Sequence, residues 1–284
     1  MSAPTAPPVA AGPATSAAGT PRPSVVLDSL SLAGRHLLLM VRRPSSIIGA
    51  IVLPIMFALL FFTIFGRIME RAGMDFAQYL LPAIIMQAVF FSAMSGSVWA
   101  AEDASSGMAA RLRVMPISRS APVASLIVGE TTRGLLGSAI LVGIGYTFGF
   151  RLETGFTGAL AMIGLIIAAS VAIILPFLVL GYATADPEPA QAIGGLIYFP
   201  LLLVSTLFVP KGAYPGWMQP IVENQPLSRI TEALRAVSTD AATVATNAGH
   251  PVNTTHAVLI ALAWCAGSII VFGALAPRVF GRTA

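Results

Sequence analysis

The sequence predicts an all-α polytopic membrane protein. Three observations lead to this fold class. Apolar residues make up 56% of the 284-residue chain and charged residues only 10%, whereas about 25% of the residues in a soluble domain are charged. The mean hydropathy is +0.83, and the charges cluster between long uncharged runs. A chain of this length can hold about six transmembrane helices of roughly 20 residues each, plus their connections.

The N-terminal part of the chain is predicted to lie outside the bilayer core. Residues 1–24 are rich in Ala, Pro, Ser and Thr and contain almost no large apolar side chain, so we expect a disordered cytoplasmic tail. Residues 25–43 place Val26, Leu30 and Leu37 at helical spacing, which predicts an amphipathic helix in the inner interface. Residues 25–284 are therefore expected to form one membrane domain.

Six apolar stretches are long enough to be predicted as membrane-spanning helices. Their expected ranges are 44–65, 79–100, 123–148, 156–184, 192–209 and 257–276. Small residues at 92–97 are expected to let neighbouring helices approach closely. A short acidic turn is expected over residues 185–191.

The interval before the last predicted span is the longest polar one. Residues 214–222 combine aromatic residues and prolines suited to a membrane interface, and residues 227–237 have helical apolar spacing. We expect one or two short helices here that dip back into the outer leaflet as re-entrant elements. Irregular backbone is permitted at that depth only where protein buries it.

The polar interval between the second and third predicted spans carries the most distinctive pattern. Residues 101–119 contain an acidic pair, Gly107 and three arginines. The interval can hold a surface helix of roughly ten residues. We expect this interval to be a docking element through which a separate motor protein pushes on the membrane domain. The alternative is that these arginines only follow the positive-inside rule.

The distribution of basic residues predicts the orientation. If the N-terminus is inside, the inner segments hold nine of the 16 Lys and Arg residues and the outer links hold six, with Arg133 near the inner end of a span. The inner basic residues lie close to the ends of the spans, where the positive-inside rule applies. Six spans then place both termini in the cytoplasm.

Several functions lack their sequence signatures. The only lysine, Lys211, does not belong to a P-loop, so an ATP site of that kind is not expected. No G-x-S-x-G or H-E-x-x-H sequence appears. The basic residues are dispersed, which argues against a nucleic-acid partner. The single cysteine, Cys265, excludes an internal disulfide and a cysteine-cluster metal site.

Two groups of residues within the spans are candidates for function. Glu130 and Arg133 lie three residues apart on one helix face. We expect them to form an ion pair in the first turns of their span, near the membrane edge, or to relay motion from the adjacent docking element. The second group is predicted either to line a path for an amphipathic substrate or to serve in packing and lipid contacts. It consists of Met86, Gln87, Phe90, Phe91, Tyr198 and Phe199.

These features resemble the membrane subunit of a type-2 ABC exporter, specifically the daunorubicin-resistance permease branch. The stretch AEDASSGMAARLRVMPISR at 101–119 resembles the family's signature between its second and third spans. The stretch FVPKGAYPGWMQPIVENQPLSRITEALRAV at 208–237 resembles the family's outer segment before the last span. One departure is Met108-Ala109-Ala110, where many relatives have a polar triplet such as Thr-Leu-Glu.

The resemblance implies which residues couple the chain to its motor. The helix within 101–119 would fit a groove on a cytoplasmic ABC ATPase, two copies of which would lie beneath the membrane domains. The implied coupling residues are Glu102, Asp103, Gly107, Arg111, Leu112, Arg113, Pro116 and Arg119. ATP and Mg²⁺ would bind to the ATPase subunits, and this chain would bind no metal or cofactor of its own.

The resemblance also implies a function and an assembly. The chain would pair with a second copy or a homologous permease among the membrane lipids and export a drug, antibiotic or lipid across the bacterial cytoplasmic membrane. Two alternatives stay open, namely an ion-coupled secondary transporter and a non-transporting scaffold or sensor subunit. The spans carry few ionisable groups, which argues against ion coupling.

Overall fold

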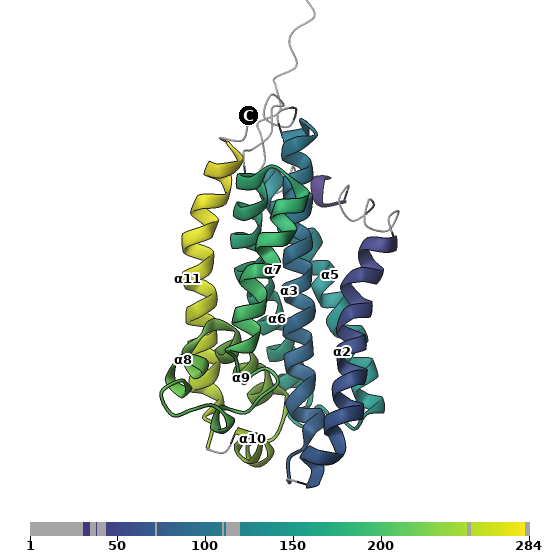
Figure 1. Cartoon of the computed structure of the whole chain (residues 1–284), viewed down its shortest axis with the longest axis vertical. Helices are drawn as coiled ribbons and strands as arrows, with labels where there is room; N and C mark the ends of the chain where they lie inside the picture. Colours follow the sequence, from purple (N-terminus) through teal and green to yellow (C-terminus); the bar gives the residue numbers. More distant parts are fainter. Residues whose placement is uncertain are drawn as a thin grey trace, which may run out of the picture.

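The chain forms a bundle of long helices with a cap of short helices at one end (Figure 1). The computed structural model describes residues 31–34, 38, 44–71, 73–109, 111, 120–248 and 251–281, with the side chains of 44–51 and 68–70 excepted. Within these ranges the regular structure is helical and contains no strand. The tail predicted over 1–24 lies outside the described residues, and so does most of the helix predicted over 25–43, of which 31–34 and 38 are helical.

Six long helices form the bundle. They are α2 (Pro44–Arg71), α3 (Phe76–Ser105), α5 (Ala121–Thr147), α6 (Gly155–Thr184), α7 (Pro187–Leu203) and α11 (Thr254–Phe280). Four of them, α3, α5, α6 and α11, are long and apolar enough to cross a membrane. The apolar part of α2 over Val52–Arg67 is shorter, and α7 has 17 residues. A polytopic membrane protein is confirmed, while six complete crossings stay a prediction.

The central helix of the bundle is α3. It packs against α2, α5, α6, α7 and α9, and α3 stands between α2 and α7 in Figure 1. Its apolar residues occur on every side, and a helix of that kind is buried by its neighbours. Leu80, Ile84 and Ile85, for example, have no exposed surface. Any movement of α3 therefore displaces most of the other helices.

Small residues allow α3 and α6 to approach closely, as the sequence predicts. A Cβ added to Gly181 of α6 would lie 2.1 Å from the backbone oxygen of Ser97 in α3. A second close approach joins α5 to α3, because a Cβ at Gly145 would lie 2.7 Å from a methyl carbon of Leu81. Gly181 therefore has no room for a larger side chain unless the helices separate, whereas a larger side chain at Gly145 would displace the Leu81 side chain.

The helix α7 begins earlier than expected, and the acidic turn predicted over 185–191 is wrong. Asp186 is the N-cap, and its carboxylate accepts a hydrogen bond of 3.1 Å from the backbone N–H of Glu188. Pro187 follows in the first helical position, where a missing N–H costs nothing. The turn is therefore confined to Ala185, which has a φ of +49°, and Asp186. At its other end α7 stops at Leu203, short of the predicted Val209.

Short helices lie across one end of the bundle, here called the capped end. They are the 3₁₀ turn η1 (Lys211–Ala213), α8 (Gln219–Asn224), α9 (Pro226–Ser238) and α10 (Ala241–Ala248). The helix predicted over 227–237 is thus confirmed as α9, whose apolar side packs against α3, α6 and α11. Figure 1 shows the end of α11 at the opposite end of the bundle, here called the terminal end.

Candidate functional site

The α3–α5 junction, which holds the predicted docking element, lies at the terminal end (Figure 1). The helix α3 ends there because Gly107 has a φ of +73°, a left-handed conformation that glycine adopts at little cost. The N–H of Ser106 donates to the carbonyl of Glu102 at 2.9 Å, and the N–H of Arg111 donates to the carbonyl of Gly107 at 3.1 Å. Residues 108, 109 and 111 are helical again, so a second helical segment starts after Gly107.

The structure describes only part of the predicted coupling set. Glu102 and Asp103 lie partly buried in the last turn of α3, and Arg111 is exposed. The other members, Leu112, Arg113, Pro116 and Arg119, lie outside the described residues. Gly107, another member of the set, lies between α3 and the helical segment that follows it. The contact with a motor protein stays a prediction.

Glu130 and Arg133 form an ion pair inside the bundle. Glu130 is completely buried and Arg133 is 4% exposed. Glu130 lies nine residues from the start of α5, about 13 Å along the helix axis. The charges of the pair are held away from water between α5 and α3.

Ser92 of α3 completes this ion pair. Its hydroxyl lies 2.7 Å from the backbone oxygen of Glu130 and 3.0 Å from the Glu130 carboxylate. The Arg133 guanidinium donates to the Ser92 carbonyl at 3.1 Å. The small side chain of Ser92 and the nearby Gly96 leave room for the pair, since a Cβ at Gly96 would lie 3.1 Å from Cγ of Glu130. The three residues tie together the two helices that flank the docking element.

The predicted substrate-path residues do not line one common cavity. Phe90, Phe91 and Tyr198 form an aromatic cluster, with ring centroids 4.7 Å apart for Phe90 and Tyr198 and 5.3 Å apart for Phe91 and Tyr198. Met86 and Gln87 are completely buried in α3, while Phe199 is 58% exposed on α7. Phe90 alone among the six borders an apolar cavity between α6, α7, α9 and α11, here called the lateral cavity.

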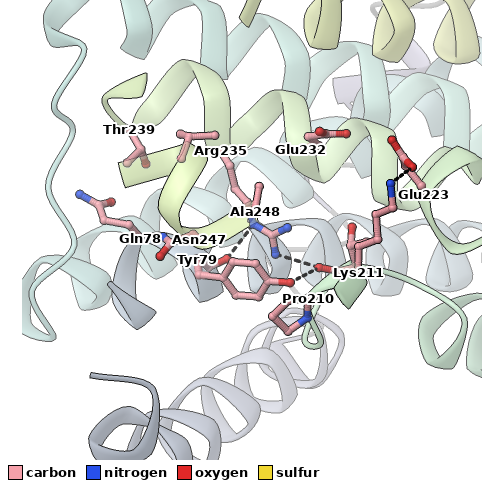
Figure 2. A pocket seen from close by; sticks show the side chains of 12 residues that line it. Gln78, Tyr79, Pro210, Lys211, Glu223, Glu232, Arg235, Thr239, Asn247 and Ala248 are labelled. Atoms are coloured by element: carbon pink, nitrogen blue, oxygen red, sulfur yellow. Dashed lines mark hydrogen bonds and ion pairs between the residues drawn. The ribbon is translucent and has the colours of Figure 1, made fainter. Parts of the chain in front are cut away.

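The capped end contains a buried arginine that sequence reasoning did not single out as a site. Arg235 of α9 donates to the backbone oxygens of Tyr79, Thr206 and Leu207 at 3.0, 3.0 and 2.8 Å. Its guanidinium carbon lies 3.7 Å from the centre of the Tyr79 ring, and Figure 2 shows the two side chains facing each other. Tyr79 in turn donates its hydroxyl to the Thr206 carbonyl at 2.7 Å. Here these residues are called the Arg235 clasp.

The Arg235 clasp joins three segments that are far apart in the sequence. These are the start of α3, the link after α7, and α9. Burial lowers the pKa of Arg235, and the neighbouring Tyr79 and Glu232 oppose this shift. One signal in the sequence was available, because Arg235 lies between Leu234 and Ala236 on an otherwise apolar part of α9. Its distant partners could not be read from the sequence.

A network of half-buried charges lies beside the clasp. Lys211 pairs with Glu223, as Figure 2 shows. Arg229 lies 3.4 Å from Glu223 and 3.2 Å from Glu232. The clasp and the network border a cavity of about 40 Å³, which is large enough for a few water molecules. Among the described residues no cluster of three His, Cys, Asp or Glu side chains is arranged for a metal ion.

Comparison with known proteins gives the class to which this chain belongs. The family model described as "ABC-2 type transporter" matches residues 29–238, well over half of the chain. The chain therefore belongs to the ABC-2 type transporter family. It is a membrane permease subunit, a class that has no ATPase site of its own.

Several relatives carry more particular names. The "Daunorubicin resistance ABC transporter permease protein DrrB1" of Streptomyces coeruleorubidus is 28% identical over 214 residues, which are 75% of this chain and 76% of the relative. The "Probable doxorubicin resistance ABC transporter permease protein DrrC" of Mycobacterium tuberculosis is 31% identical over 215 residues, 74% of this chain and 76% of the relative. The DrrB protein of the same organism, named a doxorubicin resistance permease, is 26% identical over 217 residues, 76% of this chain and 73% of the relative.

Proposed function

We propose that this chain exports a hydrophobic or amphipathic compound, such as a drug or antibiotic, across a bacterial cytoplasmic membrane. The observation that carries the proposal is the similarity to permeases named for daunorubicin and doxorubicin resistance, which extends over about three-quarters of each chain. The apolar spans support it, because they offer a route for a compound that partitions into lipid. The few ionisable groups in the spans give no series of sites for an ion gradient to drive.

The energy for export comes from two cytoplasmic ATPase subunits, which bind ATP and Mg²⁺. Their docking surface is the segment from Glu102 to Arg119, with Arg111, Arg113 and Arg119 facing an acidic groove and Leu112 filling an apolar pocket. Gly107 and Pro116 bound the docking helix. The terminal end then faces the cytoplasm together with both chain termini, and the capped end faces outward.

Movement of the docking helix reaches the bundle through α3 and α5. The first of these helices ends at the docking element and the second begins after it. Ser92, Glu130 and Arg133 hold the two helices together, so a force on the docking element moves them as one unit. In this role the ion pair is a positioning device, and no proton or ion needs to pass through it.

The exporter contains two permease chains. The helix α7 supports this part of the proposal because only Ala190, Gly194 and Tyr198 are buried among its 17 residues. Leu196 and Leu203 are 73% and 71% exposed, so most of the circumference of α7 is free to pack against a second copy or a homologous permease.

The test is co-purification of the partner ATPase with the chain, followed by ATP-dependent transport in inside-out vesicles. Arg113→Glu should abolish both the complex and transport, because it puts a carboxylate against an acidic groove. Arg278→Glu, a charge reversal in the last turn of α11 at the same end, is the matched control and should leave the complex intact. Equal loss in both variants would mean that the arginines only orient the chain.

Two other outcomes would replace the proposal. Uptake or export driven by an ion gradient without ATP would indicate a secondary transporter. A lasting ATPase complex whose hydrolysis moves no compound from a panel of apolar and amphipathic drugs would indicate a scaffold or sensor subunit.

A further inference from the structure

The lateral cavity is an apolar opening between the described helices of the bundle. Its volume is about 500 Å³, within the range of roughly 300–1,000 Å³ typical of small-molecule sites. It extends along α6 from Ala172 to Leu180, eight residues or about 12 Å of helix. The helices α7 and α11 form its two sides, and Phe90 of α3 lies at its floor.

The lining of the lateral cavity selects against charged and strongly polar ligands. The only hydroxyl among the described lining residues belongs to Ser268, and it already donates to the Ala172 carbonyl. None of these lining residues has a charged side chain. A charged group placed here would lose its hydration without gaining a counter-charge, which costs several kcal/mol. The occupant is therefore neutral and largely apolar.

The shape of the lining favours a flat, rigid molecule. Four aromatic side chains surround the space together with Pro176, and they present ring faces and edges to an occupant; they are Phe90, Phe177, Trp264 and Phe272. A planar ring system can stack on such side chains and loses little conformational freedom when it binds. A lipid acyl chain gains similar apolar contact but has to order many rotatable bonds.

The position of the cavity limits how an occupant reaches it. At the capped end Pro226, Leu227 and Ile230 of α9 close the space. The rim between α7 and α11 is apolar and open, with Ile197 and Val271 44% and 53% exposed. Because these helices belong to the membrane domain, an occupant enters sideways from the bilayer, and a lipid whose polar headgroup stays at the capped surface is blocked by α9.

We infer that the lateral cavity binds a neutral, planar, apolar molecule of small-drug size that enters from the bilayer between α7 and α11. The inference rests on the proposed export function for its purpose, and it names the chemical class of compound that the permease collects. Phe90 connects the site to the driven part of the molecule, because it lies on α3 and its ring contacts Phe177 and Tyr198 at centroid distances of 5.1 and 4.7 Å.

The site can be tested through its own tryptophan. In a Trp99→Phe and Trp217→Phe background, Trp264 is the only tryptophan left. The full-length chain in lipid nanodiscs is titrated with pyrene, a neutral planar probe that accepts energy from tryptophan. We expect a saturable loss of Trp264 emission above the linear background caused by pyrene dissolved in the lipid.

A matched pair of glycine variants separates binding in the cavity from partition into lipid. Gly267 lines the cavity and Gly164 lies outside it on α6, and an added Cβ meets nothing within 4 Å at either position. Gly267→Phe should fill part of the cavity and lower the apparent affinity for pyrene by about tenfold or more, since a misfit of one methylene already costs that factor in an apolar pocket. Gly164→Phe should leave the affinity unchanged.

The alternative occupant is a lipid acyl chain, which is tested in nanodiscs made with lipids brominated along the acyl chain. If bromolipids quench Trp264 and excess pyrene does not relieve the quenching, the cavity holds a lipid chain and the inference is wrong. It is equally wrong if the pyrene signal is only linear, if both phenylalanine variants behave alike, or if neither probe reaches Trp264 because a second copy covers the opening. ATPase co-purification is measured on the same variants. A failure of the proposed ATPase docking is then distinguished from a failure of pyrene binding in the lateral cavity.

Discussion

The two arginines that are buried among the described residues are stabilised in different ways. Arg133 is 4% exposed and Arg235 is 8% exposed, so each brings a charge into the protein interior. Arg133 is neutralised by Glu130, three residues away on the same helix. Among the described residues no carboxylate oxygen lies within salt-bridge distance of Arg235, which instead binds three backbone oxygens and the Tyr79 ring.

The Glu130–Arg133 pair is local in the sequence, whereas the Arg235 clasp joins distant segments. The Glu130–Arg133 pair is formed within one helix and is linked to α3 through Ser92. The donors of Arg235 reach the start of α3, 156 residues away, and the link after α7. We therefore expect the pair to be replaceable as a unit, whereas no single substitution can take over the role of Arg235.

Loss of the Arg235 clasp should have the largest effect. Arg235→Ala removes three hydrogen bonds from a charged donor, each worth about 1.5–3 kcal/mol, so we expect a destabilisation of roughly 5 kcal/mol. The apparent melting temperature of the purified chain should fall sharply. Arg229→Ala on the same helix is the control and should cost less, because its partners Glu223 and Glu232 are 25% and 18% exposed and can be solvated without it. Similar melting temperatures for the two variants would contradict the clasp.

Breaking the ion pair one partner at a time comes next. Glu130→Gln leaves Arg133 buried without a counter-charge and should destabilise the chain by about 3–5 kcal/mol. The double variant Glu130→Gln and Arg133→Met removes both charges and should recover most of that loss. The measurement is a double-mutant cycle on the apparent melting temperature. Additive losses would mean that the two charges act independently.

The same cycle separates positioning from stability. If the pair holds α3 and α5 together during export, the double variant should regain its melting temperature but show less transport per ATP hydrolysed. Full recovery of transport along with stability would limit the pair to a structural role.

Close packing of α3 and α6 should give a smaller effect. Gly181→Ala places a methyl group 2.1 Å from the Ser97 carbonyl oxygen, so the helices must separate, at a cost of about 1–3 kcal/mol. Gly164→Ala on the same helix meets nothing within 4 Å and should be neutral or stabilising by up to about 1 kcal/mol. A melting temperature that rises in both variants would contradict the close approach of the two helices at Gly181.

The smallest effect is expected at the exposed Asp240 at the start of α10. Hydrogen bonds from the Thr243 side chain and from the N–H groups of Thr243 and Ala242 lower the pKa of its carboxylate to about 2. Because the folded-state pKa is depressed, the cap stabilises α10 above pH about 4 and is lost as the pH falls toward 2. Amide hydrogen exchange of α10, corrected for intrinsic rates, should increase over that window in the natural chain. Asp240→Ala should show fast exchange throughout, and an unchanged pH profile in this variant would rule out the cap.

The long elements of the fold follow from composition, whereas the particular contacts depend on distant partners. Hydropathy alone locates α3, α5, α6 and α11, since a run of about 20 predominantly apolar residues indicates a membrane-spanning helix. The start of α7 was missed because Asp186 and Pro187 resemble a turn and act as a helix cap. The spacing of Glu130 and Arg133 predicts that they share a helix face, but it does not predict which helix covers them. The Arg235 clasp and the lateral cavity could not be predicted, because each is assembled from helices far apart in the chain.

The central claim is that a cytoplasmic ATPase drives the bundle from the terminal end, and cysteine accessibility tests it most directly. In a Cys265→Ala background, Arg113→Cys and Trp217→Cys are treated with a membrane-impermeant maleimide. Trp217 is 72% exposed at the capped end, so Trp217→Cys should be labelled in intact cells. Arg113→Cys should be labelled only after the membrane is permeabilised. Labelling of Arg113→Cys from outside intact cells would contradict the claim.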